Sequence, residues 1–211
     1  AFDGDADRML AVDEKGNIVD GDQVMAIIGN YMKDNGKLKK NTIVGTIMSN
    51  LGFSIMGEKN GIHIEQTKVG DRYVLENMRE NGYNIGGEQS GHIIFLDENT
   101  TGDGLLSALH LLEVMVKTNK KLSELSKVME VLPQALVNAK VPNHKKENYM
   151  EYPEIAQAIE NLEKRFAGEG RVLIRPSGTE PLVRVMIEGK DQAIIEKEAE
   201  QLADLIMETM L

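Results

Sequence analysis

Segments with helical periodicity alternate with short apolar runs through the first part of the chain. Residues 23–33 carry apolar side chains at helical spacing, and residues 42–48 form a continuous apolar run of the kind buried in parallel sheets. The alternation continues with a helix over 51–60, a strand over 62–67, a helix over 72–81 and a strand over 93–96. This order of strands and helices predicts an α/β domain.

Two further segments flank this region. Residues 9–13 and 18–19 predict a hairpin that turns at Gly16 and Asn17, and Asp20 or Asp22 is the expected N-cap of the following helix. A second helix is expected over 122–130. It follows a helix over 103–118 that is predicted from a broad apolar face formed by Leu105, Leu106, Leu109, Leu112 and Val116.

A different order of elements begins after Pro133. A strand over 136–141 is followed by a polar tract over 143–152 and a helix after Pro153. The chain then continues with strands over 171–175 and 182–188 and a closing helix capped by Asp191. We expect a small α+β domain in which helices cover an antiparallel sheet.

Composition narrows the class of protein. The 211 residues, 41% hydrophobic and 27% charged, are typical of a globular chain with two domains. No apolar run reaches the roughly 18 residues of a membrane helix, so we expect no membrane partner and a cytoplasmic location. The net charge of -10 argues against a nucleic-acid partner, and the lack of cysteine excludes thiol chemistry. The chain enters a charged loop at once, so we expect it to be the C-terminal part of a longer protein.

The first candidate site is this charged loop. Asp3, Asp5 and Asp7 alternate with small residues, so that several carboxylate oxygens can face one hard cation such as Mg²⁺. An EF-hand is rejected because Arg8 takes the position where the calcium loop needs glycine. A solvated acidic turn remains the alternative. Arg8 either neutralises these carboxylates or faces a phosphate.

Two further clusters follow predicted strands. Lys68 is a candidate proton shuttle or phosphate ligand, with an exposed lysine as the alternative, and Asp71 is interpreted as a helix N-cap. Glu88 and Ser90 lie between glycines on a turn, where they can hydrogen-bond vicinal sugar hydroxyls. A turn with incidental polar residues is the alternative there, and His92 is either a ligand contact or a strand-edge residue.

The fourth cluster lies between the last two predicted strands. Two guanidinium groups, two hydroxyls and a glycine turn match the oxygens of a phosphate, and they come from Arg175, Ser177, Gly178, Thr179 and Arg184. It is not a Walker loop, because no Gly-Lys-Ser follows. A plain hairpin turn is the weaker alternative, since an arginine lies on each flanking strand.

Together these four motifs resemble the α-D-phosphohexomutase superfamily in type and order. The resemblance implies a three-layer α/β domain followed by a smaller, TATA-box-binding-protein-like α+β domain. It further implies that residues 1–19 are the remnant of a second domain with the metal loop, that 20–131 form the sugar-binding third domain, and that 132–211 form the phosphate-binding fourth. The expected partners are a sugar phosphate and the missing N-terminal domains; a homodimer stays open.

The resemblance also implies a role for each motif. The three aspartates of the first loop would bind Mg²⁺, with Arg8 near the transferred phosphoryl group and Lys68 as the acid/base group. Glu88, Ser90 and His92 would contact the sugar, and the fourth cluster would hold the other phosphate. The Gly-Glu-Gln-Ser-Gly-His form is most similar to the branch that interconverts glucosamine 6-phosphate and glucosamine 1-phosphate for cell-wall synthesis. Branches acting on mannose or glucose phosphates, and a non-catalytic binding module, remain alternatives.

The chain departs from the superfamily pattern in two ways. Ala6 stands where the metal loop often has glycine, which would strain the loop if that position needs a positive φ. No segment carries the serine that becomes phosphorylated in the superfamily. We therefore expect the isolated chain to be catalytically inactive.

Overall fold

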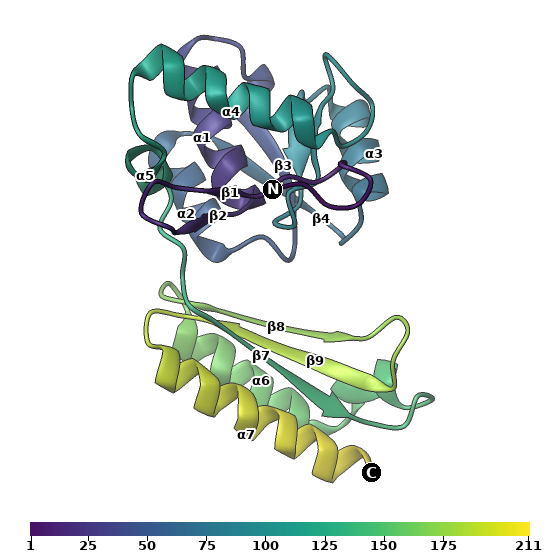
Figure 1. Cartoon of the computed structure of the whole chain (residues 1–211). Helices are drawn as coiled ribbons and strands as arrows, with labels where there is room; N and C mark the ends of the chain where they lie inside the picture. Colours follow the sequence, from purple (N-terminus) through teal and green to yellow (C-terminus); the bar gives the residue numbers. More distant parts are fainter. The chain divides into compact units, whose positions relative to one another are not determined.

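The computed structural model describes all 211 residues, which fold as two compact units (Figure 1). Unit 1 comprises Ala1–Val131 and unit 2 comprises Leu132–Leu211. None of the helices combines the length and the apolar composition needed to cross a lipid bilayer.

Unit 1 is built on a four-stranded sheet with the order β4-β3-β5-β6. Its strands are β3 (Thr42–Thr46), β4 (His63–Thr67), β5 (Ile85–Gly87) and β6 (Ile93–Phe95). The first three are parallel, and β6 runs antiparallel to β5. The continuous apolar run at β3 is fully buried, as the sequence predicts for a central strand.

Helices cover both faces of this sheet, because adjacent strand residues point to opposite sides. Ile43 belongs to the main core with α1 (Gly21–Asp34), α2 (Leu51–Asn60) and α4 (Gly104–Thr118). Its neighbour Val44 packs with Val74 and Met78 of α3 (Asp71–Asn81) in a separate core. The predicted three-layer arrangement is confirmed.

The N-terminal hairpin is part of unit 1. It consists of β1 (Ala11–Val12) and β2 (Ile18–Val19), and Met9 and Val19 lie in the main core. Asp20 is the N-cap of α1: its side chain accepts from the backbone N–H of Gln23, whose side chain accepts in return from the Asp20 N–H. Of the two predicted N-cap residues, Asp20 and Asp22, the structure has Asp20 in this role.

Three local predictions need correction. The N-cap of α3 is Gly70, so Asp71 is the first helical residue and does not cap the helix. The second predicted helix is short, with α5 (Leu122–Leu125) followed by a 3-10 turn (Ser126–Val128). The apolar face that predicts α4 is exposed at four of its five positions, while the helix buries another side that includes Leu111 and Val114.

Unit 2 has an antiparallel sheet of order β7-β9-β8. The strands are β7 (Gln134–Lys140), β8 (Arg171–Pro176) and β9 (Leu182–Glu188). Two helices, α6 (Pro153–Phe166) and α7 (Gln192–Met210), pack their apolar sides onto it, and Asp191 caps α7 as predicted. The predicted polar tract contains a 3-10 helix (Lys146–Glu151).

Candidate active site

Three of the four predicted clusters meet in unit 1 at one edge of its sheet. Lys68 directly follows β4 and Glu88 directly follows β5, so both lie at the carboxyl ends of parallel strands. His92 precedes the antiparallel β6 and therefore lies at the same edge. This is the edge at which open α/β sheets place their ligand contacts.

The acidic loop is joined to the turn at 88–91 through backbone contacts. Arg8 forms a bridge with His92, and the Met9 N–H donates to the Gly91 carbonyl at 3.1 Å. Gly91 has φ +92°, and a Cβ there would lie 2.2 Å from the Met9 carbonyl oxygen. Only glycine permits this approach, which holds the acidic loop beside the predicted sugar-binding turn.

His92 links the two segments through its side chain. Its ring is buried, with Nδ1 2.9 Å from Asp7 Oδ2 and Nε2 accepting from the Gly102 N–H at 3.1 Å. Because Nε2 accepts, Nδ1 carries the proton and donates to Asp7. Both ring nitrogens are occupied within unit 1, so a substrate contact by this ring requires one of these bonds to be given up.

The acidic loop brings its three carboxylates together. Ligand oxygens of Asp3, Asp5 and Asp7 all lie within 4.8 Å of one another, and this set of hard oxygen donors suits Mg²⁺. Desolvation alone raises the pKa of Asp3, but hydrogen bonds from the Arg8 backbone and with Asp7, together with the Arg8 charge, leave that pKa below its ordinary value. Ala6 has φ 60°, so this position adopts the left-handed conformation that glycine would adopt without strain.

The turn at 88–91 also contacts the loop that follows β4. Glu88 Oε1 accepts from the Gly70 N–H at 3.0 Å, which fixes this carboxylate beside the segment that carries Lys68. Lys68 and Ser90 are exposed and accessible to a ligand. Gln89 instead donates to the Asp20 carboxylate at 3.2 Å, so its side chain anchors the turn to the start of α1.

The fourth cluster lies in unit 2, between β8 and β9. Arg175 and Arg184 are register partners on these two strands. Burial, and secondarily the like charge of Arg184, lowers the pKa of Arg175. Arg184 pairs with Glu180 at 3.1 Å, and its buried Nε has no hydrogen-bond partner. The structure therefore brings the two predicted guanidinium groups together, in a pair whose N–H donors suit the oxygens of an anion.

Ser177, Gly178 and Thr179 form the loop beside these arginines. Ser177 is buried, and its hydroxyl accepts from the Glu180 N–H at 3.2 Å, while Gly178 and Thr179 are exposed. The hydroxyl of Ser177 therefore shapes the loop, and the exposed backbone and hydroxyl of its neighbours face solvent.

Lys146 is a residue that sequence reasoning misses. It is 7% exposed, and its ammonium donates to the backbone carbonyls of Ser177 and Glu180, at both ends of this loop. In the sequence it is one lysine in a polar tract, and nothing there marks it as buried. Its function depends on a loop 31 residues further along the chain.

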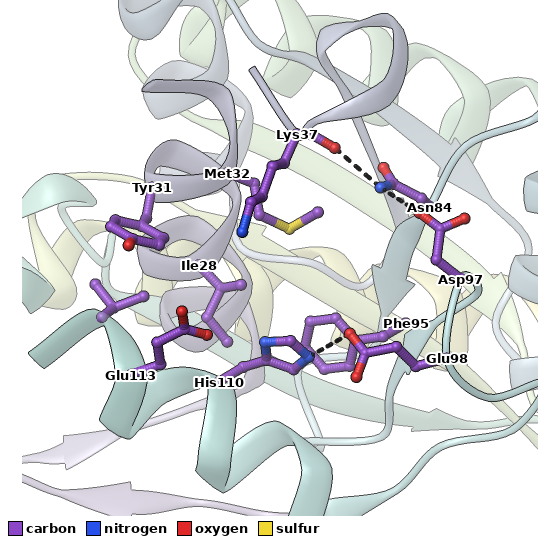
Figure 2. Close-up of a pocket in the computed structure, with 11 residues that line it drawn as sticks. Ile28, Tyr31, Met32, Lys37, Asn84, Phe95, Asp97, Glu98, His110 and Glu113 are labelled. Carbon is purple, nitrogen blue, oxygen red and sulfur yellow. Dashed lines mark hydrogen bonds and ion pairs between the residues drawn. The ribbon is translucent and has the colours of Figure 1, made fainter. Parts of the chain in front are cut away.

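A separate cavity of about 270 Å³ lies between α1 and α4 in unit 1 (Figure 2). Figure 2 shows Asn84 between Lys37 and Asp97, where its amide donates to the Lys37 carbonyl and to the Asp97 carboxylate, both at 3.0 Å. None of the predicted site residues lines this cavity. We therefore place the candidate active site at the sheet edge.

Comparison with known families agrees with this fold. The model described as phosphoglucomutase/phosphomannomutase, alpha/beta/alpha domain III, matches residues 20–132. The model of the C-terminal domain of the same family matches residues 136–205. The chain therefore belongs to the phosphoglucomutase/phosphomannomutase family, of which it carries domains III and IV.

Two similar proteins in this family are named phosphoglucosamine mutase. A phosphoglucosamine mutase from Ruminiclostridium cellulolyticum is 66% identical over 206 residues, which are 98% of this chain and 46% of that protein. A phosphoglucosamine mutase from Acetivibrio thermocellus is 63% identical over 210 residues, which are 100% of this chain and 47% of that protein. The chain thus spans about half the length of these relatives.

A solved structure supports the fold. Aspergillus fumigatus N-acetylphosphoglucosamine mutase, in complex with GlcNAc-6P and magnesium, matches 100% of this chain and 48% of its own with a TM-score of 0.78. Its sequence identity is 22%, so this likeness bears on the fold alone.

Proposed function

We propose that this chain is the sugar-binding and phosphate-binding half of a phosphoglucosamine mutase. The complete enzyme interconverts glucosamine 6-phosphate and glucosamine 1-phosphate in the cytoplasm, as a precursor step for cell-wall amino sugars. The observation that carries this assignment is the 66% identity to a phosphoglucosamine mutase across 98% of the chain. The convergence of the acidic loop, Lys68 and Glu88 at one sheet edge supports it.

In unit 1, Glu88 and Ser90 bind sugar hydroxyls. Glu88 is suited to this role because the Gly70 N–H holds one carboxylate oxygen and leaves the other for a hydroxyl. Lys68 moves a proton to or from the reacting sugar oxygen, and Arg8 binds the phosphoryl group that is transferred. His92 supports these groups by holding Asp7 in place.

Asp3, Asp5 and Asp7 hold Mg²⁺ in this proposal, which is consistent with the magnesium in the Aspergillus fumigatus complex. When bound, the ion stabilises the negative charge that develops on the transferred phosphoryl group. Aspartates are ionised at neutral pH, so these three carboxylates offer charged oxygen ligands to the ion without first losing a proton.

In unit 2, Arg175 and Arg184 bind the phosphate that is not transferred, together with the exposed Gly178 and Thr179. The guanidinium groups suit this role because paired N–H donors match phosphate oxygens. The phosphorylated serine of the mechanism belongs to another domain. The chain alone is therefore expected to bind sugar phosphates without turnover.

Calorimetry on the isolated chain tests the binding half of this function. With Mg²⁺ present, glucosamine 6-phosphate should bind, and Glu88→Gln should weaken binding about tenfold or more, because a charge-assisted hydrogen bond contributes roughly 1.5–3 kcal/mol. Glu98→Gln is the matched control, since Glu98 pairs with His110 beside the separate cavity. Equal affinity in the wild type and Glu88→Gln would refute the assigned role.

A further inference from the structure

The outward side of α4 carries an apolar surface that nothing in unit 1 covers. Leu105, Leu109, Leu112 and Val116 are 61%, 56%, 52% and 77% exposed. Most large apolar side chains of unit 1 are buried, but α4 is apolar on two sides and unit 1 covers only one of them. Contiguous exposed apolar side chains on one element mark an interaction surface.

The four side chains form one stripe. Their spacing of four, three and four residues places them on a single face of the helix, over about 16 Å at a rise of about 1.5 Å per residue. The exposed Glu113 and Lys117 lie to one side of it. We call these four residues the α4 stripe. All four side chains are more than half exposed, so the stripe does not pack against the sheet; Figure 1 shows where α4 lies in unit 1.

The position of the N-terminal segment indicates which partner covers the stripe. A Cβ on Gly104, at the start of α4, would lie 2.9 Å from the ring of Phe2, which is half exposed. Ala1 is held beside Leu10, whose backbone N–H donates to the Ala1 carbonyl at 3.0 Å. Phe2, the second residue of this chain, therefore lies beside the start of α4, next to the first residue of the stripe.

The family comparison supplies the length of chain available. This chain carries domains III and IV and spans 46% of its Ruminiclostridium relative, so more than half of that relative lies outside the matched part. On the basis of the function proposed above, we propose that the α4 stripe is the docking surface for the domains that precede Ala1 in the complete chain. A second copy of the chain is the competing occupant.

Hydroxyl-radical footprinting with mass spectrometry distinguishes these occupants. The isolated chain and the complete gene product are oxidised at two concentrations, and Leu136, half exposed on β7, is the internal reference. In the complete protein, oxidation of the stripe should fall about fivefold or more at both concentrations, because the core of an interface is desolvated. Equal oxidation in the two proteins would overturn the proposal, as would protection that disappears on dilution, which indicates a second copy.

A double variant tests the stripe itself. Leu109→Glu with Leu112→Glu in the complete protein should restore oxidation of Leu105 and Val116, because two charges oppose burial. The same change in the isolated chain should leave its urea midpoint unchanged, since both leucines are exposed there. Persistent protection in the variant would overturn the proposal. Assaying mutase activity on the same wild-type samples separates the two claims, because protection without activity refutes only the function.

Discussion

Lys146 should be essential to the stability of unit 2 although it lies outside the predicted site. Its ammonium is buried and donates to the carbonyls of Ser177 and Glu180. Lys146→Met keeps most of the apolar stem but removes the charge and both hydrogen bonds. The buried ammonium then no longer bridges the two ends of the loop: the Ser177 carbonyl loses this donor, whereas the Glu180 carbonyl keeps the backbone N–H of Leu182.

The magnitude follows from these two bonds. A hydrogen bond to a charged group contributes roughly 1.5–3 kcal/mol, and recovery of the lysine's own desolvation cost offsets part of the loss. We expect Lys146→Met to lower the free energy of unfolding of unit 2 by about 2–4 kcal/mol. With a urea slope of about 1 kcal/mol per molar for a unit of this size, the midpoint should fall by about 2 M or more.

Urea unfolding followed by hydrogen-exchange mass spectrometry measures this change, because peptides from β8 and β9 report on unit 2 alone. Lys140→Met is the matched control, since Lys140 is exposed on β7 and its loss should change the unfolding free energy by less than about 0.5 kcal/mol. If the two variants unfold at the same urea concentration, the assignment of Lys146 as a structural support of the loop is refuted.

Three further predictions concern single residues. Ala6→Gly should raise the unfolding free energy of unit 1 by up to about 1 kcal/mol in urea, because it relieves a left-handed alanine; a decrease would contradict this. Arg175→Gln should weaken binding of inorganic phosphate about tenfold or more in calorimetry, whereas Arg165→Gln, at an exposed ion pair, should not. Hydrogen bonds from Lys39 and Asn84 lower the pKa of Asp97, so its contribution to stability is present above its ordinary pKa and lost as pH falls through the lowered one. Thermal unfolding of Asp97→Asn should therefore depend less on pH below about pH 4, and an unchanged pH profile would contradict this.

The order of elements could be predicted because local patterns dominate it. The apolar run at β3 and the capping residues Asp20 and Asp191 are local signals, and the structure confirms them. The placement of Lys68 and Glu88 at one edge of the sheet could also be predicted. They follow β4 and β5, and the carboxyl ends of parallel strands lie at the same edge.

What could not be predicted depends on distant parts of the chain. Periodicity identified α4 but not which side it buries, because the helix is apolar on two sides and the buried one combines Leu111 and Val114 with the small Ser107. The burial of Lys146 depends on carbonyls of a loop far along the chain. Likewise, the positive φ of Ala6 and the contact of His92 with Asp7 depend on how the N-terminal loop packs against a turn about 85 residues away.

In the proposed function, this chain supplies the sugar and phosphate contacts of a phosphoglucosamine mutase but not its nucleophile. The most direct test compares the isolated chain, with its intact mass verified, and the complete gene product in a mutase assay with Mg²⁺ and a sugar bisphosphate activator. We predict turnover only by the complete protein, with a higher kcat/KM for glucosamine 6-phosphate than for mannose or glucose 6-phosphate. Turnover by the 211-residue chain alone, or a preference for a neutral sugar, would contradict the account.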